Sequence, residues 1–365
     1  MSEKECLFTL AARRQATERT PIWFMRQAGR ILPEYRAMRE DYSLMDICRQ
    51  PELCAEVTLQ PLRRMPLDAA VMFADIMLPL IGVGVELDLV DNVGPVIRYP
   101  IRDASGLAVL RPIEPEADVP FVLETIRLVQ RELGAERALI GFAGGPFTLA
   151  SYLIEGKPSR EFSLTKRLMY EAADLWHGLM ERLTGITITY LEAQARAGVD
   201  ALQFFDSWVG CLSPGDYATY VEPYTRRIFA ALAPMGLPFI HFGVNTAGLL
   251  DQMRGDGGTL IGVDWRIPLD VAWERIGPDL GIQGNLDPAV LLAPPAVVEV
   301  QAADVLRRAA GRPGHIFNLG HGLLPQTPLD AVMRLVDFVQ GYRPTAVQDA
   351  PVPTLAGRWK ETSHD

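Results

Sequence analysis

The amino-acid sequence predicts an α/β fold, namely a single (β/α)8 barrel of the TIM type with insertions. Short apolar runs rich in β-branched and aromatic residues recur along the chain, and segments with helical periodicity separate them. Strands that are apolar on both faces and alternate with helices form a parallel sheet covered by helices. The runs number eight, and the GxGxxG turn usual near the start of an open doubly wound sheet is missing. A closed barrel therefore fits better than an open sheet.

The eight expected strands each end near Gly, Asp or Asn. They are "PIWFM" (21–25), "DAAVMFAD" (68–75), "ALIGFAGG" (138–145), "ALQFFDS" (201–207), "PFIHFG" (238–243), "LIGVDW" (260–265), "GIQGNLD" (281–287) and "HIFNLGHG" (315–322). Helical periodicity is clearest over 167–198, 217–233 and 295–310, the last after a predicted cap at Asp287 and Pro288.

Barrel enzymes place their active sites at the C-terminal rim of the strands. We therefore expect the functional side chains among the residues that follow the strands: Asp75, Gly144, Gly145, Asp206, Ser207, Gly243, Asp264, Asn285 and His321. No Pro/Gly linker divides the barrel, so residues 1–343 are expected to form one catalytic domain with a short N-terminal arm. Residues 344–365 lack sustained periodicity and are expected to be an extended or mobile tail.

The charge balance limits the partners of the chain. Of its 365 residues, 35 are Lys or Arg and 45 are Asp or Glu, which gives a net charge of −10. This balance argues against broad attraction to nucleic acid or to an anionic membrane surface. A polyanionic ligand would need a locally basic pocket.

The cysteines and the N-terminus predict a soluble, cytoplasmic protein. Cys6, Cys48, Cys54 and Cys211 have no zinc-site spacing and are interpreted as reduced thiols. The first residues lack the apolar stretch of a secretory signal, and the run "IMLPLIGVGV" is shorter than the ~18 residues of a membrane span.

Arg26 and Arg30 would share one face of a helix, and Gly29 between them would let a ligand approach closely. Guanidinium groups suit paired recognition of carboxylates or phosphates. From the spacing alone, a surface loop paired with Glu34 or Glu40 is the commoner explanation.

The two aspartates at strand ends also allow two interpretations. Asp75 emerges from the apolar "AAVMFA", where a carboxylate must be paired or hydrogen-bonded, but Asp is also a frequent helix cap. The two readings of Asp75 are evenly balanced. For Asp206 and Ser207, capping is favoured.

Among the histidines, His321 is the one best placed to meet a substrate, because glycines flank it after a strand. His241 lies inside a strand and is more often a core residue, and no role is assigned to His177, His315 or His364. For a lone Tyr152, ordinary packing is the commoner explanation. The sequence contains no HExxH motif, P-loop or GxSxG elbow.

The motifs together are similar to those of the uroporphyrinogen decarboxylase family. The resemblance rests, from Pro21 to Pro325, on "PIWFMRQAGRILPEYR", "LQPLRRMPLDAAVMFADI", "IGFAGGPFTLASYLIEG", "ALQFFDSWVG", "GVDW", "QGNLDP" and "FNLGHGLLP". It implies a (β/α)8 barrel and a carboxy-lyase that removes the four acetate carboxyl groups of a tetrapyrrole stepwise, without cofactor or metal, in heme biosynthesis. It also implies a homodimer.

The resemblance further implies roles for single residues. Arg26, Gln27, Ala28 and Arg30 would hold the carboxylates of the substrate, and Asp75 would receive the pyrrole N–H groups. Phe142 would form part of the wall against the macrocycle. Tyr152, Ser207 and His321 would surround the carboxylates and the reacting edge, and the catalytic residues would be Asp75, Arg26, Tyr152 and His321.

Three departures from the usual family pattern concern the surroundings of these residues. Ile31 stands where an aromatic residue is usual, and Gly145 stands where Ala or Ser is more typical. The stretch "HFGVNTAG" (241–248) lacks a Gly-rich run.

Two other functions remain open. Related zinc-dependent methyltransferases carry His-x-Cys at a strand end, but here the stretch is His241-Phe242-Gly243, and no cysteine follows Cys211. A non-catalytic tetrapyrrole carrier would not need Asp75, Tyr152 and His321 together.

Overall fold

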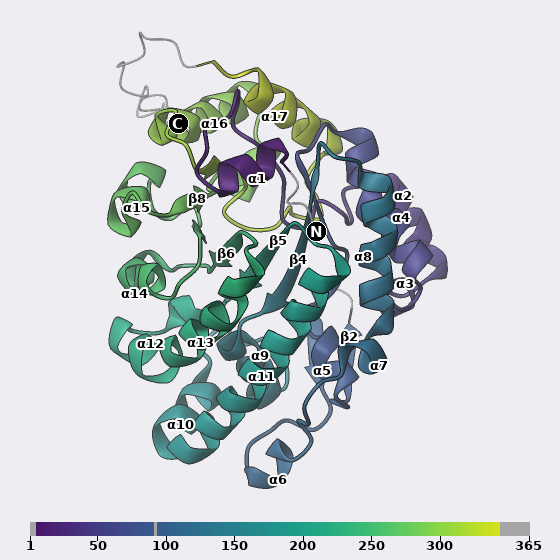
Figure 1. Cartoon of the computed structure of the whole chain (residues 1–365), viewed down its shortest axis with the longest axis vertical. Coiled ribbons are helices and arrows are strands. Elements are labelled where there is room, and N and C mark those ends of the chain that lie inside the picture. The colour runs from purple at the N-terminus through teal and green to yellow at the C-terminus, as the bar shows by residue number, and fades with distance from the viewer. Residues whose placement is uncertain (1–4, 91–92, 344–365) are drawn as a thin grey trace, which may run out of the picture.

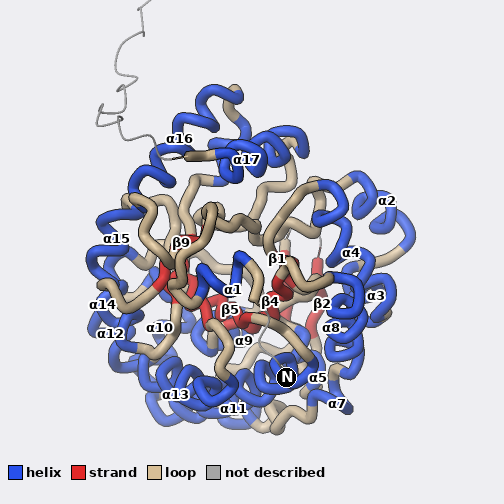
Figure 2. Tube along the Cα trace, turned by 45° about the horizontal axis from the view of Figure 1, so that its top comes forward, coloured by secondary structure: helices blue, strands red, loops and turns tan. Residues whose placement is uncertain are grey.

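The computed structural model describes residues 5–90 and 93–343, so the predicted tail lies outside the described residues. A parallel sheet of seven strands, in the order β1-β4-β5-β6-β7-β8-β9, curls into a ring with helices around it (Figure 2). Its strands are β1 (Ala69–Val71), β4 (Ala138–Gly144), β5 (Ala201–Phe205), β6 (Phe239–Phe242), β7 (Leu260–Gly262), β8 (Gly281–Gln283) and β9 (His315–Ile316). A separate antiparallel hairpin joins β2 (Leu87–Val90) and β3 (Gly94–Ile97).

The predicted first strand closes the ring. Ile22 forms a parallel bridge with Phe317, whose N–H donates to Pro21 O at 2.8 Å, and Asp68 N–H donates to Ile22 O at 3.0 Å. Residues 21–23 therefore lie between β9 and β1 in the position of the eighth strand. This confirms the (β/α)8 barrel. The expected strand is short because the chain turns away after Phe24, where Arg26 takes a left-handed φ of 62°.

Helices cover the outside of the barrel (Figure 1). The α-helices are α1 (Leu7–Ala12), α2 (Pro33–Asp41), α3 (Leu44–Arg49), α4 (Pro51–Arg64), α5 (Leu78–Gly82), α6 (Ala104–Leu107), α7 (Pro115–Asp118), α8 (Pro120–Leu133), α9 (Pro146–Glu155), α10 (Ser163–Glu171), α11 (Ala173–Ala197), α12 (Pro214–Tyr220), α13 (Glu222–Leu232), α14 (Leu250–Gly255), α15 (Leu269–Ile276), α16 (Pro295–Ala309) and α17 (Leu329–Gly341). The 3-10 turns are η1 (Val209–Cys211), η2 (Ala233–Met235), η3 (Ala247–Leu249) and η4 (Pro288–Leu292).

Two of the three predicted helices are broken. The segment 167–198 divides at Ala172 into α10 and α11, and the segment 217–233 divides at Val221 into α12 and α13. Pro223 explains the second break, because it lacks the N–H that would continue α12 and is favourable in the first turn of a new helix. The third prediction, 295–310, is confirmed as α16, and Asp287 caps η4 through Ala289 N–H at 2.9 Å.

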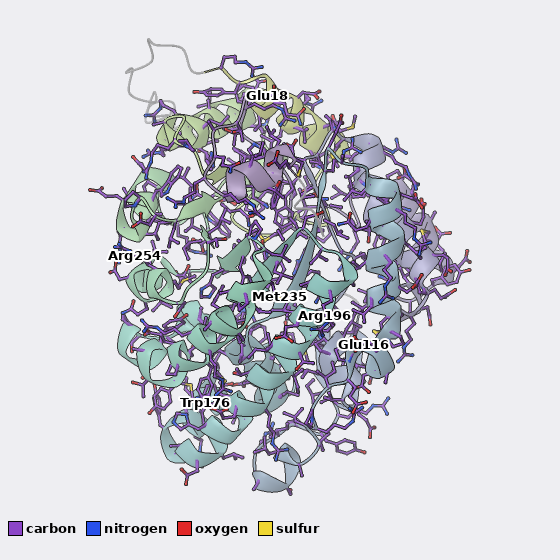
Figure 3. The ribbon with its side chains drawn as sticks, viewed as in Figure 1. Glu18, Glu116, Trp176, Arg196, Met235 and Arg254 are labelled. Carbon is purple, nitrogen blue, oxygen red and sulfur yellow. The ribbon has the colours of Figure 1, made fainter. Side chains whose placement is uncertain are left out.

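Apolar side chains fill both sides of the sheet. The larger cluster lies between the sheet and the helices and includes Trp176 of α11, whereas Glu116, Arg196 and Arg254 lie on the exposed surface (Figure 3). A second cluster fills the barrel interior, where Phe8 of α1 packs with residues such as Trp23 and Ile316.

The short helix α1 closes the N-terminal end of the barrel. Just beyond it, Arg13 donates to Gly236 O at 3.2 Å and Arg14 donates to Pro278 O at 2.8 Å, two carbonyl groups that precede β6 and β8. These hydrogen bonds fasten the chain after α1 to the N-terminal ends of two strands. No helix in the described ranges is long and apolar enough to cross a membrane.

Candidate active site

A cavity of about 660 Å³ opens at the C-terminal rim, a volume typical of small-molecule sites. Its wall brings together eight of the nine residues predicted to bind substrate: Arg26, Ala28, Arg30, Asp75, Phe142, Tyr152, Ser207 and His321. They come from the loop after residue 23, from the ends of three strands, from β4 and from α9. Residues up to 295 positions apart in the sequence, Arg26 and His321, therefore line the same cavity.

The ninth residue, Gln27, is fully buried and is not part of the cavity wall. Its Oε1 accepts Phe24 N–H at 2.9 Å, and its Nε2 donates to Ala69 O at 2.9 Å. Gln27 thus fixes the arginine loop to strand β1. The resemblance predicts that Gln27 belongs to the segment that holds the carboxylates of the substrate, and its side chain hydrogen-bonds to the backbone of that segment and of β1.

Arg26 and Arg30 lie on a loop of turns that precedes α2, not on a helix. Both are exposed, and the aliphatic part of Arg26 lies against Gly322, where an added Cβ would come within 2.5 Å of Arg26 Cδ. Glu34, a suggested partner, binds Arg64 instead, with Nε to Oε1 at 2.6 Å. Arg26 forms no ion pair with any residue in the described part of the chain, so its charge can serve a ligand.

Asp75 both caps a turn and lines the cavity, which are the two interpretations that the sequence left evenly balanced. Its Oδ1 accepts Met77 N–H at 2.8 Å and so orders the turn before α5, while the carboxylate also lines the cavity. Burial raises the pKa of Asp75, and the Met77 N–H and the Arg26 charge only partly oppose it. An ionised Asp75 is therefore short of compensating positive charge, which a cationic or N–H-rich ligand would supply.

His321 is a neutral hydrogen-bond donor near pH 7. Its Nδ1 accepts Gly322 N–H at 2.6 Å, which leaves the proton of the neutral ring on Nε2. Burial, with a further contribution from Arg26, lowers the pKa of His321 to about 4. The imidazole therefore carries too little charge near pH 7 to serve as a general acid.

Aromatic side chains form the apolar part of the wall. Phe142 and Phe205 meet edge to face at 5.3 Å between centroids, and Phe205 meets Phe242 at 5.9 Å. Tyr152 packs on Trp208 with centroids 4.0 Å apart, and burial raises the pKa of its phenol. These rings make part of the cavity wall apolar, while the arginine loop provides positive charge.

The comparisons with known proteins agree with this arrangement. The sequence model described as uroporphyrinogen decarboxylase (URO-D) matches residues 3–342. Proteins named uroporphyrinogen decarboxylase are 54% identical over 334 residues in Thermus thermophilus, covering 92% of this chain and 97% of the relative, and 51% identical over 344 residues in Sorangium cellulosum, covering 94% and 98%. The chain belongs to the uroporphyrinogen decarboxylase family. It is accordingly an enzyme of the carboxy-lyase class.

Solved structures support the same barrel. A methyltransferase from Methanosarcina mazei superposes with a TM-score of 0.75 at 18% identity, covering 91% of this chain and 96% of its own. At this identity the likeness concerns the fold alone. The match to the uroporphyrinogen decarboxylase family does not favour the zinc-methyltransferase alternative, and within residues 5–90 and 93–343 no cluster of His, Cys, Asp and Glu could hold a metal ion.

Several residues of the wall were not foreseen. Thr148 and Trp208 line the cavity, as do Leu89, Val90, Val93, Gly94 and Pro95 from the β2–β3 hairpin. Polar and apolar residues alternate in "ELDLV", and the turn-forming stretch "DNVG" follows. This pattern is a hairpin signal that could have indicated this element. Nothing in the local sequence indicates that the hairpin reaches the cavity of the barrel.

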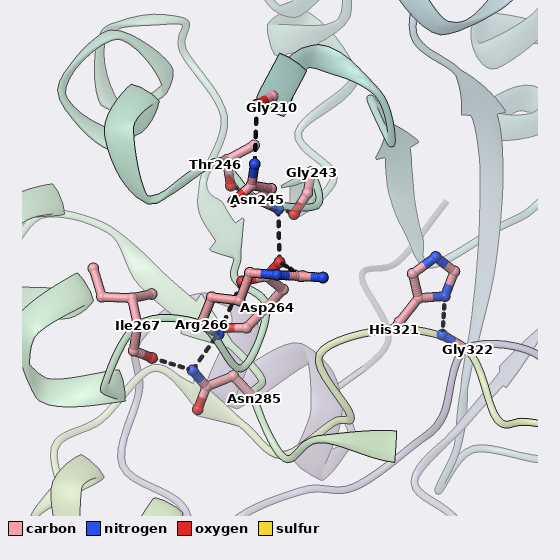
Figure 4. A network of polar contacts seen from close by, with 10 residues as sticks. All are labelled: Gly210, Gly243, Asn245, Thr246, Asp264, Arg266, Ile267, Asn285, His321 and Gly322. Atoms are coloured by element: carbon pink, nitrogen blue, oxygen red, sulfur yellow. Dashed lines mark hydrogen bonds and ion pairs between the residues drawn. The ribbon is translucent and has the colours of Figure 1, made fainter. Parts of the chain in front are cut away.

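Other predicted rim residues hold loops in place (Figure 4). Asp264 Oδ2 accepts Asn245 N–H at 2.6 Å and pairs with Arg266, and Asn285 Nδ2 donates to Asp264 O at 2.9 Å and to Ile267 O at 2.7 Å. Gly243 belongs to the same network, because its carbonyl accepts the Thr246 hydroxyl at 3.4 Å. None of Gly243, Asp264 and Asn285 is among the cavity-lining residues.

Proposed function

We propose that the chain catalyses the cofactor-independent, stepwise decarboxylation of the four acetate side chains of uroporphyrinogen to methyl groups, giving coproporphyrinogen, in tetrapyrrole and heme biosynthesis. One observation carries the proposal. A single cavity holds the Asp75 carboxylate beside an aromatic wall, with the Arg26 and Arg30 side chains at its edge. Such a cavity is complementary to a macrocycle with N–H groups at its centre and carboxylates around it.

The reaction needs an electron sink, because loss of CO2 from a methylene carbon leaves an electron pair. Protonation of the pyrrole carbon that bears the acetate makes the ring a cation, which takes up this pair as the carbon–carboxyl bond breaks. A second proton on the exocyclic carbon gives the methyl group, and the ring proton is released. Each cycle converts one carboxylate and one proton into CO2 and a methyl group, so the substrate supplies the chemistry that other enzymes obtain from a cofactor.

Asp75 is assigned to the stabilisation of the ring cation. Its carboxylate would accept pyrrole N–H groups and face the positive charge as it develops. A preorganised charge in a water-poor cavity acts more strongly than in bulk solvent. The raised pKa of Asp75 fits this role. The buried carboxylate lacks nearby positive charge, and the cationic intermediate provides that charge.

Arg26 and Arg30 are assigned to hold the carboxylates of the substrate, with Ala28 close to it and Gln27 fixing their loop. Guanidinium forks pair with carboxylates in two-bond geometry. Because an arginine side chain keeps its proton in proteins, binding and orientation are the main role of Arg26. A cationic edge on a chain of net charge −10 also draws the polyacid to one place on the surface.

Tyr152, Ser207 and His321 are assigned to the reacting edge. Each can donate a hydrogen bond to a substrate carboxylate, Tyr152 through its protonated phenol and His321 through Nε2–H. The low pKa of His321 directs proton delivery toward water or Arg26 rather than toward this imidazole. Phe142 is assigned to the wall against the macrocycle.

The proposal extends to the whole chain. We place the catalytic barrel in residues 1–343 as one domain, working in the cytoplasm as the homodimer that the family resemblance implies. Sedimentation equilibrium would test the dimer.

Anaerobic incubation with uroporphyrinogen III, without added cofactor, tests the function directly. We expect release of CO2 and the successive appearance of hepta-, hexa-, penta- and tetracarboxylate products, separated by chromatography after oxidation. Elemental analysis of the active protein should return no stoichiometric zinc. Binding of the octacarboxylate without turnover would overturn the proposal in favour of a carrier.

A further inference from the structure

A buried histidine outside the cavity wall lies between two carboxylates. His241, in β6, is completely buried, with Nε2 3.8 Å from Asp206 Oδ2 and Nδ1 3.6 Å from Asp256 Oδ2. The side chains of both aspartates are also completely buried. Neither ring nitrogen has a hydrogen bond to any described residue, and neither do Asp206 Oδ2 and Asp256 Oδ1.

The surroundings provide little other compensation for the two carboxylates. Tyr217 of α12 donates its O–H to Asp256 Oδ2 at 2.7 Å, and Arg226 Nε of α13 lies 4.0 Å from Asp256 Oδ1, at the edge of the ion-pair range. Glu222 of α13 adds negative charge near Asp256, which burial already gives a raised pKa of about 7. The aromatic rings of Phe204 and Phe229 also pack against the imidazole, with their centroids each 5.3 Å from its centroid.

The two nitrogen–oxygen distances lie within the range of an ion pair but beyond that of a hydrogen bond. A neutral imidazole has one N–H and can face one carboxylate favourably, whereas here an acceptor lies opposite each nitrogen. An imidazolium ion offers an N–H to both. Because a buried carboxylate without compensation is strongly destabilising, positive charge on the ring of His241 stabilises both aspartates.

The other oxygen of Asp206 connects this triad to the cavity wall. Asp206 Oδ1 accepts the Thr148 hydroxyl at 3.3 Å, and Thr148 Oγ1 in turn accepts Trp208 N–H at 3.4 Å. The Trp208 ring packs on Tyr152 with centroids 4.0 Å apart. Thr148, Ser207, Trp208 and Tyr152 all line the cavity, so the orientation of the Asp206 carboxylate is transmitted to the wall.

We propose that His241 is a positioning residue: as an imidazolium between Asp206 and Asp256, it fixes the wall formed by Thr148, Ser207, Trp208 and Tyr152. The proposal rests on the decarboxylation proposed above, which this wall would serve. His241 touches no substrate and acts only through Asp206. Its loss therefore disturbs the placement of reacting groups rather than removing a group from the reaction.

Three variants test the role of the ring. His241→Phe keeps the ring shape and removes both N–H groups, and His241→Gln keeps a donor that can serve one carboxylate. His315→Phe is the control, because His315 is a second buried histidine, at the opposite end of the barrel, with Nε2 3.0 Å from Gly284 O. Thermal unfolding and circular dichroism establish that each variant folds.

The kinetic expectation follows from small displacements of the wall. We expect His241→Phe to lower kcat/KM tenfold to about a hundredfold, mainly through kcat, because ångström-scale misplacement costs this much. His241→Gln should lie between the Phe variant and the unsubstituted protein, and His315→Phe should stay within about twofold. Full kcat/KM in a folded His241→Phe variant would overturn the proposal.

A spectroscopic measurement on the unsubstituted protein decides the charge state of His241 independently of activity. With 15N-labelled histidine, and His241→Phe or His241→Gln for assignment, we expect two ring N–H signals for His241. One bare ring nitrogen would overturn the proposal. If the unsubstituted protein shows no turnover, the proposed function fails, while the nitrogen signals still report whether the imidazolium exists.

Discussion

Asp206 Oδ1 occupies the space that a side chain at position 145 would need. A Cβ built on Gly145 would lie 2.6 Å from this oxygen, closer than real Cβ contacts allow. The glycine that replaces the more typical Ala or Ser of the family is therefore matched to the buried carboxylate opposite it.

Gly145→Ala should consequently destabilise the protein by about 1–3 kcal/mol, the usual cost of overpacking a filled interior. The matched control is Gly185→Ala in α11, where a Cβ meets nothing within 4 Å and an alanine should stabilise the helix by ~0.5–1 kcal/mol. Urea unfolding of both variants gives the comparison. A Gly145→Ala variant as stable as the unsubstituted protein would show that Asp206 can move aside.

Asp75→Asn is expected to separate activity from stability. Loss of the preorganised charge should cost ~3 kcal/mol in the barrier, on the order of a hundredfold in kcat. Because the pKa of Asp75 is raised by burial, its ionised form destabilises the folded state at neutral pH, and this penalty disappears in acid, below the pKa of the unfolded chain. Asn, which can still accept the Met77 N–H, should therefore raise the free energy of unfolding at pH 7.

Chemical denaturation of Asp75→Asn and the unsubstituted protein between pH 4 and pH 8 checks the sign. The stability difference should be largest at the alkaline end and shrink toward pH 4. If the variant is less stable than the unsubstituted protein at pH 7, the ionised Asp75 carboxylate is not short of stabilising positive charge or N–H groups.

Arg26→Gln should shift the acid limb of the pH profile. Arg26 lowers the pKa of Asp75 in the present structure, so its removal raises that pKa further. The carboxylate needed for the reaction is then lost at a higher pH, and the acid limb of kcat/KM moves upward. Arg63→Gln, which removes an exposed ion pair with Glu56, is the control and should leave the limb in place. An unmoved limb in Arg26→Gln would argue that Asp75 does not control it.

The sequence predicted the barrel from local signals, whereas most of the residues that line the cavity were predicted from the resemblance to the family. Apolar runs that end in Asp, Gly or Asn mark strands and rim directly, and the arginine loop carries a distinctive pattern. Asp206 was wrongly favoured as a helix cap, because its contacts to His241 and Thr148 depend on distant segments. Asp264 has the same local signal as Asp75 but holds a loop. Only the register of the closed barrel decides which of the two faces the cavity.

His321 provides the last test, through the hydrogen that it carries. With a pKa of about 4, the ring is neutral above pH 5, so kcat between pH 6 and pH 8 should show no step from its titration. His321→Gln retains an N–H donor and should keep more activity than His321→Phe, which fills the space without donating. Steady-state rates of both variants across this pH range give the comparison. Equal activity of the Gln and Phe variants would show that the hydrogen bond from Nε2 is not the reason for a histidine at this position. A step in kcat against pH that is present in the unsubstituted enzyme and absent from both variants would show that the imidazolium acts as an acid.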